Sequence, residues 1–563
     1  MPLAQNRSNW LHDKTEARAN GGMVSSRHPL SAEAGLEILE AGGNAADAAI
    51  AASFAESVVQ PAASTIGGGG LFTFRSAAGQ ASGINYMWQA PIAARPDMFP
   101  MEGKAERGLF GWSGVKDAAN EFGGLAVAVP GSVAGLVKAS AKHGRLPLAR
   151  IMEPAIRLAR DGFAMDWYGC LMAGIHLDII RKYPTAARML LRDGQYPPRP
   201  DMIGRADIHR QPELARTLAL IAEGGAEAFY TGAVAQSIVD AVAANGGIVS
   251  LEDLATYEAV ETPPIEIRYR GHRITGDPSG FIIYAQILNT LAHFDVASLK
   301  PDSAGWLHLL IEVFRHALAD RQKAPYDHRS AGGLWRELVA ETYGATLASR
   351  IDTRKRSDVA SPLGDGAASG PAQDSRTVHI AAIDADGGMA SLTETVIGNY
   401  GSYVMSETGV LLNNGMISFA PVPGYTNSIS SGGRPPSSFV SPLHITRPDG
   451  QSIITIGSSG GVKIMTSVLQ IACFMLDHGM SAQEAVSFPR IDFEGTKVIL
   501  DGRFSAETVA ELRRRGHDIE IRSEGLSTFE FGNPSVLARD AQGIVTGGVN
   551  PYQATTAIGH DRA

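Results

Sequence analysis

The spacing of apolar residues predicts a first part of the chain built mainly from helices. A first helix is expected to begin at Ser31 and end at Gly42, and Asn44 is suited to cap a second helix over residues 47–59. Residues 65–76, TIGGGGLFTFRS, predict a glycine-rich bend that leads into a strand. Helical spacing recurs in four later stretches, at residues 131–143, 147–161, 212–223 and 231–245.

A long amphipathic helix and then a change of composition follow. Residues 303–322 carry apolar side chains on one helical face. Residues 357–376 are small, polar and rich in Gly, Pro and Ser, which is typical of a flexible linker. Strand-like segments follow it, with an apolar helix expected at 464–476, so we divide the chain into residues 1–376 and 377–563. The apolar face of the long helix comprises Trp306, Leu309, Leu310, Val313 and Ala317.

The first strands after the linker form a predicted hairpin around the turn DADGG. A turn centred on Asp386 places Thr377 opposite Thr395. A two-residue Asp-Gly turn would instead place Val396 opposite Thr377. Both registers stay open at this point, so a hydroxyl beside Thr377 is one of two alternatives.

Composition narrows the class of protein. With 49 Lys and Arg against 58 Asp and Glu, the net charge of −9 argues against binding of nucleic acid or an anionic membrane. The 44% apolar content of 563 residues is enough for a large core. Neither a secretory signal nor a membrane span is evident, so a cytoplasmic location is expected. Cys170 and Cys473 form no CxxC motif, and HExxH, dinucleotide-binding and Walker motifs are missing, so no metal or cofactor is expected.

The stretch GSSGG satisfies the GxSxG pattern between a strand and a helix, which makes Ser459 a candidate hydrolase nucleophile. Its partners would come from Asp477 or Asp518 and from His517 or His560, in the chain order of α/β-hydrolases. A glycine-rich chain of this length meets the pattern readily by chance, and no parallel βαβ series precedes it. We therefore favour a glycine-rich turn whose backbone amides face a site.

Thr377 is the stronger candidate because the linker ends directly before it. If the chain is cut after Arg376, Thr377 becomes an N-terminal residue. Its free α-amino group, with a pKa near 8, can then take the proton of its own hydroxyl. A threonine at the start of a strand otherwise reflects only β propensity.

Several stretches occur in a characteristic order along the chain. They are AGLEILEAGGNAADAAIA (34–51), IGGGGLFTFRS (66–76), PGSVAGL (130–136), TVHIAAIDADG (377–387), ETGVLLNN (407–414), RPPSSFVSP (434–442) and GSSGGVKI (457–464). In this combination the chain resembles the γ-glutamyltransferase family, a branch of the N-terminal-nucleophile hydrolases, from about residue 22 to residue 556.

The resemblance implies a self-processing enzyme. Thr377 would cut its own chain after Arg376 and then serve as the catalytic nucleophile, and Thr395 would steady its hydroxyl. The other implied site residues are the oxyanion-hole pair Gly460 and Gly461 and the carboxylate-binding pair Ser437 and Ser438.

The chain departs from the family pattern in the pocket for the glutamyl group. Pro96 stands where the family has an arginine, and Arg95 lies one residue earlier. Ile397 replaces an asparagine, and Gly415 and Ser418 replace a glutamine and an aspartate. That aspartate is expected to pair with the substrate ammonium, so its replacement removes the anion from the pocket. The nucleophile is therefore kept while the glutamyl pocket is changed.

We therefore expect an α+β fold, the four-layer αββα sandwich of N-terminal-nucleophile hydrolases. The expected function is an amidohydrolase or acyltransferase that cleaves a small carboxylate-bearing amide through a Thr377 acyl-enzyme. Two alternatives stay open: a true γ-glutamyl hydrolase or transpeptidase that uses Arg95, and an inactive homologue that only binds. The two fragments are expected to stay together as a heterodimer, with a dimer of heterodimers left open, and no nucleic acid or membrane partner is expected.

Overall fold

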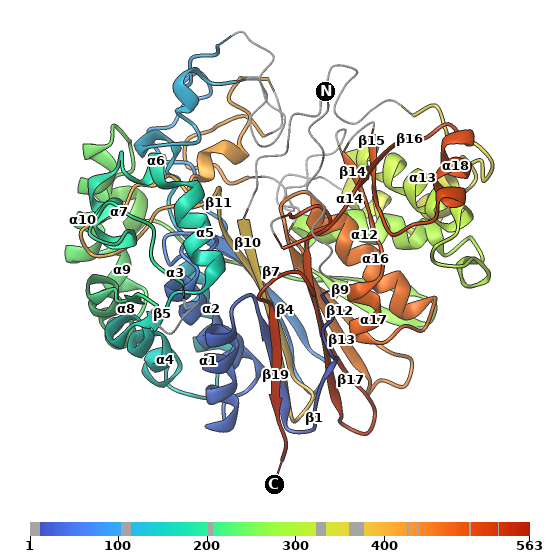
Figure 1. Cartoon of the computed structure of the whole chain (residues 1–563), viewed down its shortest axis with the longest axis horizontal. Coiled ribbons are helices and arrows are strands. Elements are labelled where there is room, and N and C mark those ends of the chain that lie inside the picture. Colours follow the sequence, from blue (N-terminus) through green and yellow to red (C-terminus); the bar gives the residue numbers. More distant parts are fainter. Residues whose placement is uncertain are drawn as a thin grey trace.

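Two seven-stranded antiparallel sheets lie face to face, and helices cover both outer faces (Figure 1). The computed structural model describes residues 12–102, 114–200, 206–321, 334–359, 376–424, 427–435, 440–494, 497–526 and 528–562. This arrangement is the αββα sandwich predicted from the sequence, and its α+β class is confirmed.

Each sheet takes strands from both sides of the predicted cleavage point. In spatial order the first sheet consists of β19 (Thr556–His560), β2 (Gly22–Ser26), β10 (Arg376–Asp384), β11 (Met389–Ile397), β3 (Gly69–Arg75), β4 (Ala81–Asn85) and β7 (Val260–Thr262). The second consists of β1 (Ala17–Ala19), β18 (Val545–Val549), β17 (Asn533–Arg539), β13 (Ile453–Ser459), β12 (Leu443–Thr446), β9 (His272–Gly276) and β8 (Ile265–Tyr269). The two halves of the chain therefore share one interior.

The helices form two separate outer layers (Figure 1). The first sheet is covered by α1 (Pro29–Glu40), α2 (Ala45–Val59), α3 (Ser132–His143), α4 (Leu148–Asp161), α8 (Pro212–Gly224) and α10 (Gly232–Ala244). The second is covered by α12 (Pro278–Leu291), α13 (Ala304–Arg321), α16 (Lys463–Leu476) and α17 (Ala482–Ser487). A small sheet of β14 (Ile491–Glu494), β15 (Lys497–Asp501) and β16 (Asp518–Arg522) lies beyond α16.

The ends of the first two helices follow local capping chemistry. Asn44 caps α2 as predicted, because its side chain accepts from the Asp47 amide while the Asp47 carboxylate accepts from the Asn44 amide. The predicted start of α1 at Ser31 is wrong. Pro29 occupies the first turn, and Nδ1 of His28 accepts a hydrogen bond from the Leu30 amide at 3.1 Å, so the helix begins two residues earlier.

Helix α13 differs from its predicted amphipathic character. The five predicted apolar residues are buried, but so are all the remaining residues from 306 to 317. Its polar side chains are paired inside the protein: His308 hydrogen-bonds His517 at 2.7 Å, and the Glu312 carboxylate accepts from the Ser357 amide at 2.8 Å. None of the described helices combines the length and apolarity that crossing a bilayer requires.

Candidate active site

The hairpin of β10 and β11 lies at the centre of the first sheet and has the register that places Thr377 opposite Thr395. The alternative with Val396 is thereby excluded. The odd-numbered residues of β10 face the second sheet: Ala381 packs in the cluster between the sheets, and the His379 ring lies against the backbone of Gly457 in β13. Thr377 lies on this same face by the alternation of a strand.

The hydroxyl of Thr395 contacts the peptide bond that precedes Thr377. It donates a hydrogen bond to the Arg376 carbonyl oxygen at 2.6 Å and accepts one from the Ile397 amide at 2.7 Å. Ile397 has a φ of 73°, which is strained for a β-branched residue. In this backbone conformation the Ile397 amide donates its hydrogen bond to the Thr395 hydroxyl oxygen. The hydroxyl proton of Thr395 is then directed at the Arg376 carbonyl.

Two guanidinium groups lie over the same pair of aromatic rings next to this peptide bond. Arg376 lies 4.7 Å from the ring centre of Phe529 and 5.8 Å from that of Tyr168 in α5 (Trp167–Ile175). Arg27 lies 5.1 Å from the Phe529 ring and 5.2 Å from the Tyr168 ring. Nε of Arg376 also donates to Oδ1 of Asn399 at 3.0 Å. All of these contacts converge on the residue before Thr377.

A glycine turn follows β13 and lies next to the Phe529 ring. Gly460 and Gly461 have φ values of 127° and 63°, which favour glycine, and their carbonyls accept from the first residues of α16. Neither glycine amide donates a hydrogen bond to any residue that the structure describes. A side chain at Gly460 would lie 3.6 Å from the Phe529 ring, so the turn and Arg376 both adjoin that ring. Free backbone amides of this kind can stabilise a developing oxyanion.

The serine-hydrolase alternative finds no support in the geometry. The hydroxyl of Ser459 is buried and lacks a partner among the described residues. Asp477 instead accepts from the Tyr269 hydroxyl at 2.9 Å and pairs with Arg270, and His517 bonds His308. The GSSGG stretch is therefore a backbone turn, as favoured from the sequence.

Comparison with known proteins decides the family. The gamma-glutamyltranspeptidase family model matches residues 31–559. The glutathione hydrolase proenzyme of Escherichia coli (strain K12) is 32% identical over 529 residues, covering 91% of this chain and 88% of that protein. The acylase ACY 1 proenzyme of Pseudomonas sp. (strain V22) is 34% identical over 541 residues, covering 95% and 93%. The chain belongs to the gamma-glutamyltranspeptidase family.

A solved structure agrees with this assignment. The cephalosporin acylase from Bacillus halodurans superposes with a TM-score of 0.84 at 25% identity, covering 100% of both chains. As a member of the gamma-glutamyltranspeptidase family, the chain is an amide-bond hydrolase or acyltransferase of the N-terminal-nucleophile superfamily.

Two of the positions that depart from the family pattern, Gly415 and Ser418, lie against a tryptophan. Gly415 and Ser418 lie in the short helix η4 (Gly415–Ser418) beside the end of β11, where the Asn414 amide donates to the Val396 carbonyl. A side chain at Gly415 would approach Trp88 to 2.6 Å, and Nε1 of Trp88 donates to the Ser418 hydroxyl at 3.0 Å. The indole therefore occupies the space that larger polar side chains would need.

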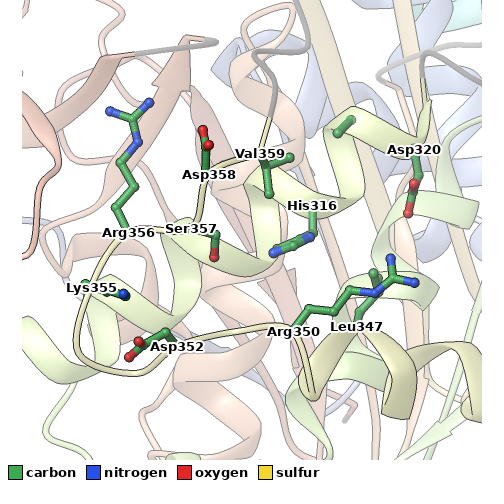
Figure 2. A pocket seen from close by; sticks show the side chains of 11 residues that line it. His316, Asp320, Leu347, Arg350, Asp352, Lys355, Arg356, Ser357, Asp358 and Val359 are labelled. Atoms are coloured by element: carbon green, nitrogen blue, oxygen red, sulfur yellow. The ribbon is translucent and has the colours of Figure 1, made fainter.

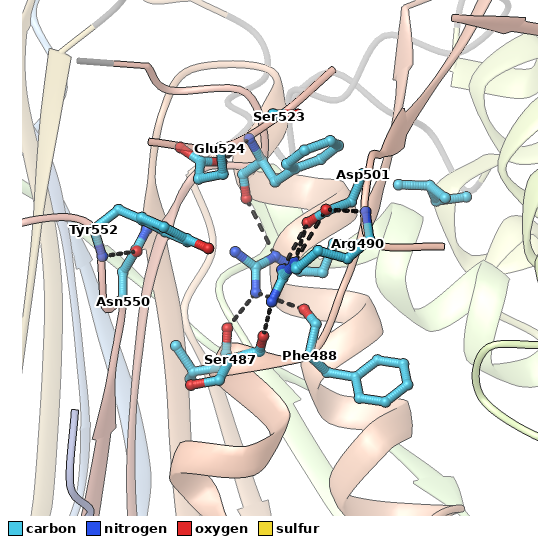
Figure 3. A network of polar contacts seen from close by, with 12 residues as sticks. Ser487, Phe488, Arg490, Asp501, Ser523, Glu524, Asn550 and Tyr552 are labelled. Atoms are coloured by element: carbon cyan, nitrogen blue, oxygen red, sulfur yellow. Dashed lines mark hydrogen bonds and ion pairs between the residues drawn. The ribbon is translucent and has the colours of Figure 1, made fainter. Parts of the chain in front are cut away.

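The segment that carries Phe529 is held by a buried polar network (Figure 3). Nε of Arg490 donates to the Phe531 carbonyl at 3.4 Å, and the Glu524 carboxylate accepts from the Phe531 amide at 2.9 Å. Nζ of Lys463 donates to the Phe529 carbonyl at 2.7 Å. Burial raises the pKa of Glu524 to about 8, although the Arg490 charge opposes the shift. The network holds the backbone of the segment whose Phe529 ring packs against Arg376.

Other predicted site residues lie on the surface or outside the described part of the chain. Arg95 is on the surface, with its side chain 75% exposed and 3.7 Å from Asp97. Ser437 and Ser438 lie outside the described residues, as does most of the predicted linker, from 360 to 375. The roles predicted for these residues stay predictions.

A separate cavity of about 630 Å³ lies where the chain enters the predicted linker (Figure 2). His316 of α13 and Arg350 line it together with residues 355–359, and it includes none of the residues around Thr377. Within the described residues no cluster of three or more His, Cys, Asp or Glu side chains could hold a metal ion.

Sequence reasoning missed the residues that surround Arg376. Arg27, Tyr168, Asn399 and Phe529 come from four separate segments, and none lies in a motif that suggests a site. Only the position of Arg27, two residues before the start of the first helix, could have drawn attention to an unusually placed charge.

Proposed function

We propose that this chain is a self-processing amidohydrolase or acyltransferase that cleaves a small carboxylate-bearing amide through an acyl-enzyme on Thr377. The observation that carries the proposal is the Thr395 hydroxyl, which donates to the carbonyl of Arg376 directly before a buried threonine. The names of the relatives, proenzymes of a glutathione hydrolase and an acylase, support it.

Processing begins with attack of the Thr377 hydroxyl on the Arg376 carbonyl carbon. The Thr395 hydroxyl stabilises the charge that develops on the carbonyl oxygen. The C–N bond then breaks, the acyl group moves to the Thr377 oxygen, and the hydroxyl proton passes to the nitrogen, which becomes the α-amine of Thr377. Water hydrolyses the ester and leaves fragments of 376 and 187 residues from the 563.

The mature site then repeats this chemistry on a substrate. The free α-amine of Thr377 takes the proton of the hydroxyl as the oxygen attacks the substrate amide. The amides of Gly460 and Gly461 receive the oxyanion, the substrate amine departs with a proton, and the acyl-enzyme remains. Water completes hydrolysis, and an amine acceptor would complete transfer.

The substrate proposed here has a carboxylate and no α-amino group. The family positions for the ammonium's partner are Gly415 and Ser418, beside the Trp88 indole. Burying an unpaired ammonium costs several kcal/mol. A true γ-glutamyl activity that uses Arg95 is the second candidate, and the exposed position of Arg95 does not favour it. The third is an inactive binding homologue, which would stay uncut.

Denaturing electrophoresis with N-terminal sequencing tests the proposal. Wild-type protein is expected to yield two fragments, the smaller beginning at Thr377, and Thr377→Ala is expected to stay whole and inactive. A wild-type chain that stays intact under activating conditions, or a Thr377→Ala chain that still splits after Arg376, would falsify it.

The fragments are proposed to remain a heterodimer after the cut. Both central sheets contain strands from the two parts, so separation would expose the interior of each. Gel filtration of cut protein under native conditions should give one peak containing both fragments, and two peaks would contradict the association. The cytoplasmic location is part of the proposal and is tested by cell fractionation.

A further inference from the structure

Arg27 is a buried cation beside the proposed nucleophile. It lies between β2 and α1 with a side chain that is 2% exposed. Nη1 donates to the Thr377 carbonyl oxygen at 3.0 Å, and Nη2 donates to the Tyr168 hydroxyl at 2.8 Å. The guanidinium is thus fixed against the backbone of Thr377 itself.

The charge of Arg27 has no close anionic partner among the described residues. The acidic group whose pKa the Arg27 charge lowers is Glu56, and its carboxylate accepts from the Ser26 hydroxyl at 2.8 Å. Burial raises the pKa of Glu56 to about 7, so this group is only partly ionised near neutral pH. A buried cation with so little compensation favours an anion beside it.

Cleavage after Arg376 would change what lies beside Arg27. In the intact chain the Arg376 guanidinium shares the Phe529 and Tyr168 rings with Arg27, so two like charges adjoin. When the new C-terminal residue withdraws, its side chain leaves the space over these rings. Arg27 stays, since its bonds run to Thr377 and Tyr168, and the new α-amine of Thr377 adds a second positive group.

We propose that Arg27 binds the carboxylate of the substrate's acyl group in the space that Arg376 vacates. The assignment rests on the proposed function and names the acyl class. Four bonds separate the Thr377 hydroxyl oxygen from its carbonyl oxygen, so Nη1 of Arg27 lies within about 7 Å of the nucleophile. A dicarboxylic acyl group of about five carbons or fewer spans that distance.

Three anilides of matched chain length test the assignment on processed wild-type enzyme. Glutaryl-p-nitroanilide carries the carboxylate, pentanoyl-p-nitroanilide replaces it with a methyl group, and 4-aminobutanoyl-p-nitroanilide replaces it with an ammonium. The expected kcat/KM for the glutaryl compound exceeds that of the pentanoyl compound by about thirty-fold or more, with the ammonium compound lowest. Equal rates, or a preference for the ammonium compound, would overturn the assignment.

Variants assign the preference to a residue. Arg27→Gln is expected to reduce the glutaryl-over-pentanoyl ratio by about thirty-fold, mainly through KM, and Arg27→Lys to restore part of it. Arg216→Gln, at a 70% exposed position on α8, is the control and should keep the wild-type ratio. If Arg95→Gln rather than Arg27→Gln removes the ratio, the assignment to Arg27 is wrong.

Failure of this assignment and failure of the proposed function give different results. If Thr377→Ala remains active on the anilides, the nucleophile is wrong. If Thr377→Ala is inactive but wild-type enzyme ignores the acyl carboxylate, only the role of Arg27 is wrong. The substrate series on wild-type enzyme gives its answer even where an Arg27 variant fails to mature.

Discussion

The nucleophile hairpin and the η4 region end beside each other but differ in how they relate to the family pattern. In the hairpin, Thr377 and Thr395 face each other in the register expected of the family, and the glycine turn after β13 adjoins them through Phe529. In η4, Gly415 and Ser418 pack against Trp88 instead of presenting acidic or amide side chains. Under the proposed function, the hairpin breaks the amide bond and the η4 region selects the substrate.

The two regions position their groups in different ways. The hairpin positions its hydroxyls by strand register, which a change elsewhere in the core cannot easily alter. The η4 region positions its groups by side-chain volume, so one indole is enough to fill it. Specificity can therefore change while the reaction stays the same.

The largest predicted effect is on kcat/KM for substrates with and without an α-amino group. γ-Glutamyl-p-nitroanilide should be cleaved with a kcat/KM lower than that of its glutaryl counterpart by roughly thirty-fold to several-thousand-fold. The physical reason is that Ser418, which accepts from Trp88, stands where the family pattern has the aspartate expected to pair with the ammonium. Steady-state kinetics on processed enzyme provide the measurement. A faster γ-glutamyl reaction would mean that another acidic residue serves the ammonium.

A second prediction concerns the rate of self-cleavage, which depends on the Thr395 hydroxyl in the hairpin. Thr395→Val keeps the shape of the side chain but removes the donor to the Arg376 carbonyl. Self-cleavage is expected to slow by about 100-fold to 1,000-fold, as when one oxyanion donor is lost. The rate is followed by electrophoresis, with Thr346→Val on the surface of α15 (Glu341–Ala348) as the control. Unchanged cleavage would show that this hydrogen bond is not used.

A third prediction concerns the buried face of the hairpin. Burial raises the pKa of Glu394, which accepts from the Ser53 hydroxyl, to about 7 from an ordinary value of 4.5. Between pH 4.5 and 7 the folded chain keeps a proton that the unfolded chain has lost, so stability falls as pH rises. Glu394→Gln should lose less free energy of unfolding than the wild type over this range, by about 3 kcal/mol.

Urea unfolding at several pH values measures this difference in an uncut Thr377→Ala background. Burial lowers the pKa of both His379 and His444 to about 3, which produces a slope of opposite sign below pH 6.5. That slope is common to both proteins and cancels in the comparison. Glu407→Gln, with a side chain 71% exposed, should behave like the wild type. Parallel pH profiles for Glu394→Gln and the wild type would refute the prediction.

The smallest effect tests the packing of η4. Gly415→Ala should reduce the free energy of unfolding by about 1–3 kcal/mol, because its methyl group would meet the Trp88 ring. Gly174→Ala, near the end of α5 and 3.8 Å from Pro197, is the matched control and should be neutral or slightly stabilising. If both variants unfold alike, the indole does not fill the site as described.

The features that the sequence could predict are those set by neighbours in the chain. Asn44 caps a helix because Asp47 is three residues away, and Thr377 faces Thr395 because a turn at Asp386 joins their strands. The error at Ser31 is of the same local kind, since His28 and Pro29 supplied a better start.

The rest depends on contacts between distant segments. Trp88 lies 327 positions before Gly415 in the chain, and Arg27 meets residues near 168, 377 and 529. The spacing of apolar residues also could not show that the polar side chains of α13 are paired in the interior, with His517 and Ser357. Such contacts depend on tertiary packing, which local patterns do not encode.

The positions of the edge strands bear on whether the chain could be circularly permuted. β1 and β19 are edge strands of the two stacked sheets, and Asn20 exchanges hydrogen bonds with Asp561 and Arg562 at 2.9 and 2.6 Å. The C-terminal end of the described chain therefore contacts Asn20, whereas the first described residue, His12, packs against Tyr552. Circular permutation would need a linker that spans the distance between these two places. A rearranged gene could join the ends by such a linker and begin translation at Thr377. Removal of the initiating methionine would then expose the nucleophile with no peptide bond to cut, so turnover could be measured independently of maturation.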